Sequence, residues 1–257
     1  DRGDFAMAAT LYREACDKGT MAGCTNLGLL YESGKGVEAD KAMAAQLYTK
    51  GCDGDSGDSC NNLALLYDRG EGVEQDLSRA VQLFRTACDK GSANGCTGLG
   101  IAFENGRSIS KDGNKAAQYY RMACDMGDSW GCTNLGFLLA DGSLVKRDYP
   151  QSAKYYQLGC DKGDMLGCTN LGFAYENGQG LPKNVKRGVT LYRQGCEGGD
   201  PLGCKNLGVM YENGSGVGQD KAKALDLFQK GMTLDPRGDT RQELLDGISR
   251  LGGKAPE

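Results

Sequence analysis

The sequence contains 257 residues, among them 41 glycines, 12 cysteines and no histidine. The lack of histidine excludes Ser-His-Asp triads, Cys-His dyads, histidine-ligated zinc hydrolases and axial histidine on haem. Lysine and arginine total 30 against 34 aspartates and glutamates, and the net charge of −4 disfavours duplex DNA and anionic membranes as partners. No apolar run approaches the roughly 18 residues that indicate a membrane-spanning helix.

The cysteines form two series that repeat every 36 residues, and the two members of each pair are eight residues apart. The first series is Cys16, Cys52, Cys88, Cys124, Cys160 and Cys196, and the second is Cys24, Cys60, Cys96, Cys132, Cys168 and Cys204. Leucines and aromatic residues keep the same step without an insertion between Tyr12 and Phe228. Such self-similarity is typical of stacked repeats. We therefore expect a half-repeat at 1–19, six repeats at 20–235, and a capping helix with a tail at 236–257.

Each repeat is expected to form a helix, a turn and a second helix. In the unit 20–55, apolar residues at helical spacing predict a first helix over 22–32, and the glycine-rich segment 34–37 ends it. Asp40 then predicts the N-cap of the second helix. Residues of capping type recur at the equivalent positions Asp4, Asp76, Asp112, Asp148, Asn184 and Asp220. Residues 239–251 are expected to form an amphipathic helix that covers the last repeat.

The spacing within each cysteine pair indicates a chain reversal. On one continuous helix, residues eight apart lie about 12 Å apart along the axis, whereas a disulfide needs Cα atoms within about 7 Å. A bond between Cys16 and Cys24 therefore requires a turn, for which Gly19 is suited. The alternatives are a metal site and free thiols. Histidine and Cys-x2-Cys are both absent, and the twelve cysteines form six pairs with none left over. We predict one disulfide per pair and an oxidising compartment.

A recurring string carries a family resemblance. Gly-Cys-Thr-Asn-Leu-Gly-x-x-Tyr-Glu-x-Gly-x-Gly-Val, at 23–37 and echoed at 203–217, resembles the Sel-1-like repeat, a relative of the tetratricopeptide repeat. The paired cysteines and the period are similar to those of the secreted, cysteine-rich bacterial members. The resemblance implies an all-α fold: a right-handed α/α solenoid of helix–turn–helix repeats, stapled by disulfides, with a concave face that usually binds protein. We expect no cofactor and no metal.

An enzymatic function is the alternative, because some members of that family are described as penicillin-binding β-lactamases. A weak hydrolase of β-lactams or peptidoglycan fragments needs Ser-x-x-Lys on a helix, with Ser-Asp-Asn-like and Lys-Thr-Gly elements. Ser108-x-x-Lys111 and Ser143-x-x-Lys146 occur, but they lie at different phases of the repeat and in expected loops, and the other elements are absent. We therefore assign no catalytic residue and favour a binding protein.

One carboxylate recurs in most repeats, in the series Glu32, Asp68, Glu104, Glu176 and Glu212. Neighbouring repeats in a helical solenoid lie about 8–10 Å apart, a separation that could fit the carboxylate pair of an inverting glycosidase. A solvated acidic stripe is the favoured interpretation.

Asparagines recur on the first helix of the repeats, the helix that solenoids use for binding. They are Asn26, Asn62, Asn134, Asn170 and Asn206. Because a side-chain amide both donates and accepts, the row suits an extended peptide or a terminal carboxylate. In this it resembles the carboxylate-clamp tetratricopeptide domains. The alternative, that these amides stabilise the stacking of repeats, stays open.

Apolar bulk on the same face increases toward the C-terminus. Trp130 occupies the position of Ala22 and Asp58, and Phe137 and Phe173 occupy that of Leu29. Tryptophan is enriched among interface hot spots, although Trp130 could instead pack between repeats. We predict a partner-binding groove centred on Trp130 and formed by Asn26, Asn62, Trp130, Asn134, Phe137, Asn170, Phe173 and Asn206.

We therefore expect an exported repeat scaffold that binds a protein or an extended peptide in its concave groove. It is expected to be monomeric on its own, to bind no nucleic acid and to insert no segment into a membrane. The expected location is secreted or periplasmic, and the mitochondrial intermembrane space is the alternative oxidising compartment. The first residues do not resemble a signal peptide, so we expect an exported protein to be represented by its mature form or by a trimmed piece of it.

Overall fold

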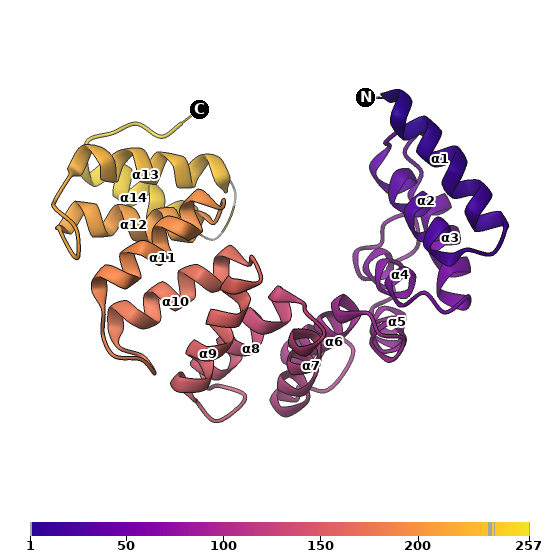
Figure 1. Ribbon diagram of the computed structural model, residues 1–257, viewed down its shortest axis with the longest axis horizontal. Helices are drawn as coiled ribbons and strands as arrows, with labels where there is room; N and C mark the ends of the chain where they lie inside the picture. The colour runs from indigo at the N-terminus through magenta and orange to yellow at the C-terminus, as the bar shows by residue number, and fades with distance from the viewer. Residues whose placement is uncertain (1, 236–237, 239, 257) are drawn as a thin grey trace. The chain divides into compact units, whose positions relative to one another are not determined.

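The structure is a computed structural model that describes residues 2–235, 238 and 240–256, and it describes the backbone alone for residues 2 and 3. The chain divides into two compact units, residues 1–131 and 132–257 (Figure 1). Every regular element in the described part of the chain is an α-helix. Each unit is therefore a stack of helices.

The helices are short and nearly equal in length. The first unit contains α1 (Arg2–Asp17), α2 (Met21–Ser33), α3 (Lys41–Asp53), α4 (Gly57–Arg69), α5 (Leu77–Asp89), α6 (Ala93–Asn105) and α7 (Gly113–Asp125). Helix α8 (Ser129–Asp141) begins in the first unit and ends in the second. The second unit continues with α9 (Tyr149–Asp161), α10 (Met165–Asn177), α11 (Val185–Glu197), α12 (Pro201–Asn213), α13 (Lys221–Leu234) and α14 (Arg241–Arg250).

The second helix of each repeat begins at a side-chain cap, as the sequence predicts. The Asp40 carboxylate accepts a hydrogen bond from the Met43 backbone N–H at 2.8 Å, which satisfies a donor that the first turn leaves free. The same bond forms at Asp76, Asp112, Asp148, Asn184 and Asp220. The prediction is wrong for Asp4, because α1 begins at Arg2 and Asp4 lies within its first turn.

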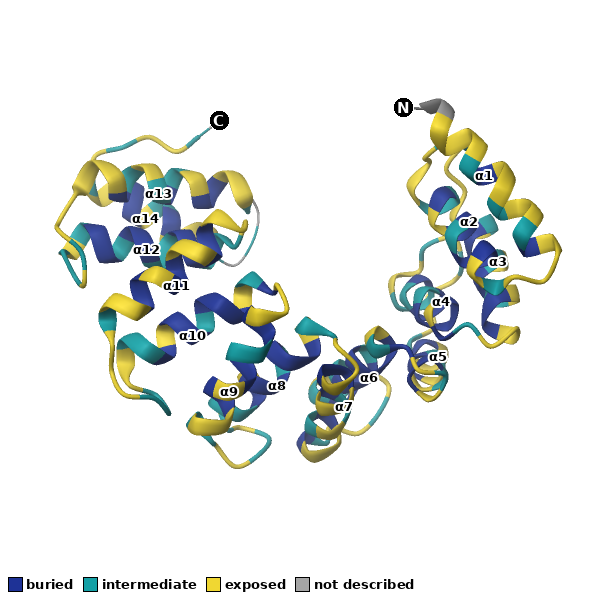
Figure 2. Cartoon of the chain, in the orientation of Figure 1, coloured by how far each residue is buried: buried dark blue, intermediate teal, exposed yellow. Residues whose placement is uncertain are grey.

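Consecutive helices pack on each other from α1 to α7 and from α9 to α14, and first helices of successive repeats also pack on each other. Helix α4 contacts α2 and α6 in the first unit, and α12 contacts α10 and α14 in the second. The buried residues follow one side of each helix (Figure 2). Gly28 permits the close approach of α2 and α3, because a Cβ there would lie 2.5 Å from Tyr48 Cε1. Helices α2, α4 and α6 thus form one layer in the first unit, and α10, α12 and α14 form one in the second.

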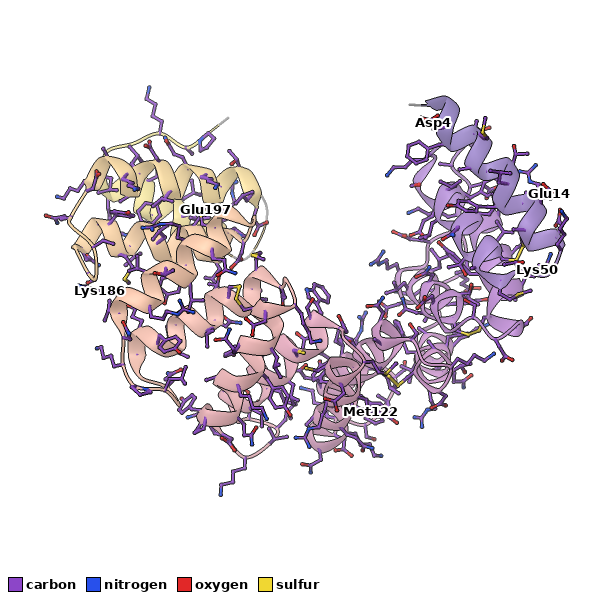
Figure 3. All side chains as sticks on the ribbon, in the orientation of Figure 1. Asp4, Glu14, Lys50, Met122, Lys186 and Glu197 are labelled. Atoms are coloured by element: carbon purple, nitrogen blue, oxygen red, sulfur yellow. A yellow bond between two sulfur atoms is a disulfide. The ribbon has the colours of Figure 1, made fainter. Side chains whose placement is uncertain are left out.

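Five disulfides join the second helix of one repeat to the first helix of the next (Figure 3). They are Cys16–Cys24, Cys52–Cys60, Cys88–Cys96, Cys160–Cys168 and Cys196–Cys204, with Cα atoms 4.4–4.6 Å apart. Cys124 and Cys132 are disulfide-bonded too, so no described cysteine is free. Gly19 makes the predicted reversal with a φ of +86°. The expected disulfide-stapled helical fold is confirmed.

Helix α14 covers the end of the second unit. Leu244 and Ile248 are buried against Phe228 and Met232, the latter standing where a cysteine of the first series would fall. The helix is shorter than the predicted 239–251, since it spans 241–250, and Asp239 lies outside the described residues. Apolar packing of α14 therefore covers the end of the last repeat, where no disulfide is present.

Candidate functional site

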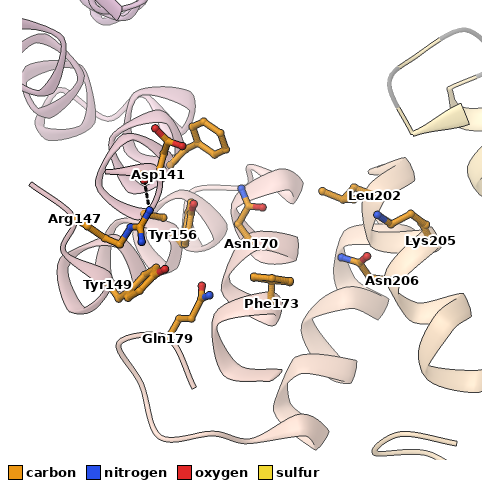
Figure 4. Close-up of a pocket in the computed structure, with 12 residues that line it drawn as sticks. Asp141, Arg147, Tyr149, Tyr156, Asn170, Phe173, Gln179, Leu202, Lys205 and Asn206 are labelled. Atoms are coloured by element: carbon orange, nitrogen blue, oxygen red, sulfur yellow. Dashed lines mark hydrogen bonds between the residues drawn. The ribbon is translucent and has the colours of Figure 1, made fainter. Parts of the chain in front are cut away.

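A pocket of about 460 Å³ opens on the second unit, where α8, α9, α10 and α12 converge with the loops that follow α8 and α10 (Figure 4). It is lined by Phe137, Ala140, Asp141, Arg147, Tyr149, Tyr156, Asn170, Phe173, Gln179, Leu202, Lys205 and Asn206. Ligand-binding clefts commonly have volumes of about 300–1,000 Å³. The pocket is therefore large enough to hold one or two side chains of a peptide.

The apolar wall of the pocket is exposed to solvent. Phe137 is 54% exposed and Phe173 is 47% exposed, and Leu202 is half-buried beside them. Aromatic side chains bury a large area at interfaces and lose little conformational freedom when they do so. Two exposed phenylalanines at one pocket thus provide a contact surface for an apolar group.

The asparagine amides beside this wall have no partner inside the chain. Asn170 and Asn206 are partly exposed, and within the described residues their side-chain amides make no hydrogen bond. In the first unit, by contrast, the Asn62 amide oxygen accepts from the Asn61 amide at 3.3 Å. A role in repeat stacking is therefore not supported for Asn170 and Asn206, whose donors and acceptors are available to a ligand.

Two cations complete the pocket. The Arg147 guanidinium donates to the Asp141 carbonyl at 2.7 Å and lies over the Tyr149 ring, 5.6 Å from its centroid. Lys205, whose side chain is 16% exposed, forms an ion pair with Glu243 at 2.5 Å. The single lining carboxylate, Asp141, accepts two hydrogen bonds from Ser143, and these hold its pKa below the usual range. The lining thus contains two cations and one carboxylate, and of the two cations Lys205 is already paired with a glutamate.

Each member of the acidic series has a partner, so the expected solvated stripe is wrong. The Tyr48 hydroxyl donates to Glu32 at 2.8 Å, and Tyr192 donates to Glu176 at 2.5 Å. Tyr120 donates to Glu104 in the same way. Where phenylalanine replaces the tyrosine, the acid binds arginine instead, in the pairs Asp68–Arg107 and Glu212–Arg250. Burial, and then the bond to the glutamate, raises the pKa of Tyr48, Tyr120 and Tyr192.

One repeat departs from this arrangement. Ala140 stands where its neighbours carry Glu104 and Glu176, although Tyr156 keeps the tyrosine of the pair. The Tyr156 ring packs on Gly136 as Tyr48 packs on Gly28. Burial raises the pKa of Tyr156 to about 12, although a hydrogen bond with the Ser152 side chain lowers this pKa. Ala140 and Tyr156 both line the pocket, so the repeat that lacks the carboxylate is the repeat at which the pocket opens.

The predicted groove residues are distributed over both units. Phe137, Asn170, Phe173 and Asn206 line the pocket of the second unit. Asn134 belongs to the same unit but not to the lining, and the first unit contains Asn26, Asn62 and Trp130. Trp130 is 60% exposed, which does not support its alternative role as a packing residue between repeats. The groove as a whole stays a prediction.

Sequence reasoning missed the charged side chains of the pocket and Tyr149. Arg147 and Tyr149 come from the loop and helix start after α8, and Lys205 replaces a threonine of the period of 36. The equivalent positions carry Thr25, Asn61, Thr97, Thr133 and Thr169. Lys205 and Ala140 both differ from the residues that the other repeats carry at the same position. Such departures from the repeat pattern are visible in the sequence and could have pointed to the pocket.

The serines considered for catalysis lie in exposed loops. Ser108 belongs to the loop between α6 and α7, and Ser143 belongs to the loop between α8 and α9. The Ser143 hydroxyl donates to Asp141. Neither serine therefore lies on a helix that would hold it on one face with the lysine three residues later, as the β-lactamase arrangement requires.

The described residues contain neither a cluster of metal ligands nor a membrane-spanning helix. No group of three or more cysteine, aspartate or glutamate side chains is placed to hold a metal ion. None of the described helices is both long enough and apolar enough to cross a bilayer.

The family model named Sel1 repeat matches seven segments of the chain, at residues 1–20, 22–56, 57–92, 93–128, 131–164, 166–200 and 201–233. These segments cover most of the sequence. The chain belongs to the Sel1 repeat family. The expectation drawn from the recurring string is thereby confirmed.

Solved structures support the Sel1 solenoid. A Sel1 repeat protein from Oxalobacter formigenes superposes with a TM-score of 0.77 at 24% identity, over 87% of this chain and 96% of that one, and it shows the fold. The protein c5321 of uropathogenic Escherichia coli, described as a protective antigen with an SLR fold, superposes with a TM-score of 0.74 at 27% identity. That match covers 94% of this chain and 55% of the Escherichia coli chain.

A curated relative matches over one repeat. It is a Helicobacter pylori protein named "Putative beta-lactamase HcpE", 42% identical over 38 residues. The match covers 15% of this chain and 11% of the relative, so the chain spans only about a tenth of that protein in the matched region. A match of this length shows one shared repeat, and it does not show that the two proteins share an activity.

Proposed function

We propose that the chain is an exported scaffold that binds an extended peptide segment of a protein partner across the first helices of the second unit. The observation that carries the proposal is the pair of unpartnered amides, Asn170 and Asn206, beside the exposed Phe173 at the pocket. Amides that alternate with aromatic side chains can bond a peptide backbone and hold its side chains.

The dimensions of a helical stack suit an extended chain. Neighbouring repeats lie about 8–10 Å apart, and an extended peptide advances about 3.3 Å per residue. About three peptide residues therefore match one repeat, so a short linear segment reaches Asn170 and Asn206 at the same time. Export is supported by the disulfides, because paired cysteines persist mainly in oxidising compartments.

Replacement of the two asparagines tests the proposal. We expect Asn170→Ala and Asn206→Ala each to weaken the binding of a peptide selected from a random linear library by about tenfold, the loss that follows when a peptide group goes unbonded. Fluorescence anisotropy with labelled peptide measures the affinity. Gln151→Ala is the matched control, because Gln151 is an exposed amide on α9 that lies outside the pocket lining.

Two outcomes would contradict the proposal. The library could yield no peptide that binds the oxidised protein above background. Alternatively, the selected peptides could bind the two asparagine variants and the Gln151→Ala control with the affinity of the wild type.

A further inference from the structure

We infer that the pocket of the second unit binds an acidic side chain of the peptide, whose carboxylate takes the place that Ala140 leaves empty in the repeat pattern. The inference rests on the proposed function, since it names the chemistry that the peptide must carry. Aspartate and glutamate are the residues that provide this group.

The first step of the inference is the pattern of tyrosine and acid. In three repeats a buried tyrosine donates its hydroxyl to a glutamate 16 residues earlier, as Tyr192 does to Glu176. Tyr156 keeps the ring position of that tyrosine, but Ala140 provides no acceptor. Among the described residues no carboxylate accepts from Tyr156. Its hydroxyl, which interacts with the Ser152 side chain, thus lacks the carboxylate acceptor that Tyr192 has.

The second step is charge. Arg147 and Lys205 line the pocket together with Asp141, and because Lys205 is already paired with Glu243, Arg147 is the cation that keeps donors for a ligand. The bond between Arg147 and the Asp141 carbonyl uses one of the five guanidinium donors. The remaining donors can form a charge-assisted pair with an incoming carboxylate, which is stronger than a neutral hydrogen bond. The Arg147 guanidinium therefore offers a cationic partner to an acidic ligand.

The third step decides between a side chain and a chain end. Asn206 and Leu202 of α12 lie in the same lining as Asn170 and Phe173 of α10 (Figure 4). These groups suit a peptide that continues across both helices. The group missing at Ala140 is itself a side-chain carboxylate. The occupant is therefore an acidic residue within a segment, flanked by an aliphatic or aromatic residue that contacts Phe137 and Phe173.

Variants at the pocket separate this role from folding. Ala140→Glu restores the acid of the pattern, so Tyr156 regains an internal acceptor and the pocket fills. Ala140→Gln fills the same space without charge, and Tyr156→Phe removes the hydroxyl while keeping the ring. Tyr120→Phe is the matched control, because it breaks the equivalent bond with Glu104 in the first unit. A thermal unfolding curve for each variant verifies that it folds.

The probes are acetylated and amidated peptides of about nine residues, long enough at about 3.3 Å per residue to cross three repeats. One contains a central Leu-Glu-Phe on an alanine background, and its partner contains Leu-Gln-Phe. A third has neutral side chains and a free C-terminal carboxylate. We expect the wild type to bind the glutamate peptide about tenfold more tightly than the glutamine peptide, the preference that a charge-assisted bond provides. Ala140→Glu and Tyr156→Phe should abolish that preference, and Tyr120→Phe should keep it.

The outcomes distinguish the two proposals. Equal affinity for the glutamate and glutamine peptides, with both weakened by Asn170→Ala, would overturn the acidic pocket and leave the peptide scaffold intact. Tightest binding of the peptide with the free C-terminus would assign the site to a chain end and overturn the side-chain assignment. A preference for glutamate that survives in Ala140→Glu and in Tyr156→Phe would place the carboxylate elsewhere. No binding of any peptide would overturn both proposals.

Discussion

Replacement of Gly180 by alanine is expected to destabilise the second unit by about 2–5 kcal/mol, the sum of a left-handed backbone penalty and overpacking against a rigid neighbour. Gly180 has a φ of +73°, and a Cβ there would overlap the carbonyl group of Tyr149 and the nitrogen of Pro150. Those atoms are backbone and cannot move aside as a side chain would. Urea denaturation followed by circular dichroism measures the loss.

The chain offers a matched control in Gly199. It also has a positive φ, +97°, but a Cβ there would meet nothing within 4 Å. Gly199→Ala should therefore cost only the backbone penalty, about 1–2 kcal/mol. Equal losses for the two variants would contradict the close contact between the loop after α10 and the start of α9. Since Gln179 and Tyr149 line the pocket, Gly180→Ala is also expected to weaken peptide binding.

Removal of one disulfide gives the second large effect. The double variant Cys160→Ala and Cys168→Ala is expected to lose about 2–3 kcal/mol of stability, because the bond closes a short loop whose entropy the unfolded chain then regains. Alanine is preferred to serine because both cysteines are buried and a hydroxyl there would need a partner. The midpoint of urea denaturation, measured without reductant, checks the value.

Reduction provides the control for this variant. A reductant that opens the disulfides should destabilise the wild type by more than the double variant loses, since every junction is then released. If the reduced wild type unfolded at the same urea concentration as the oxidised protein, the disulfides would not contribute to the stability of the stack.

The repeat architecture could be predicted from the sequence because its determinants are local. A cap such as Asp40 bonds a backbone group three residues on, and Cys16 pairs with a cysteine eight residues away. Such signals are complete within a few residues and recur at the same step. The same reasoning failed at Asp4, where a residue of capping type lies inside a helix that begins earlier.

Most of the pocket could not be predicted, because its walls come from residues far apart in the chain. Arg147 and Lys205 face one ligand site only through the packing of α8, α9, α10 and α12. The exception at Ala140 is visible in the sequence, yet its meaning depends on Tyr156 bonding an acid 16 residues earlier in the other repeats. Only the structure shows that the acidic series is held by tyrosine and arginine.

The claim that a peptide lies across Asn170 and Asn206 is tested most directly by the side-chain amide resonances of the ¹⁵N-labelled protein during a peptide titration. We predict that the NH₂ signals of Asn170 and Asn206 shift on binding. The signal of Asn177, which donates within α10 to the Phe173 carbonyl at 2.9 Å, should stay in place. Shifts confined to α9, α11 and α13, with Asn170 and Asn206 unmoved, would contradict the binding face proposed for this protein.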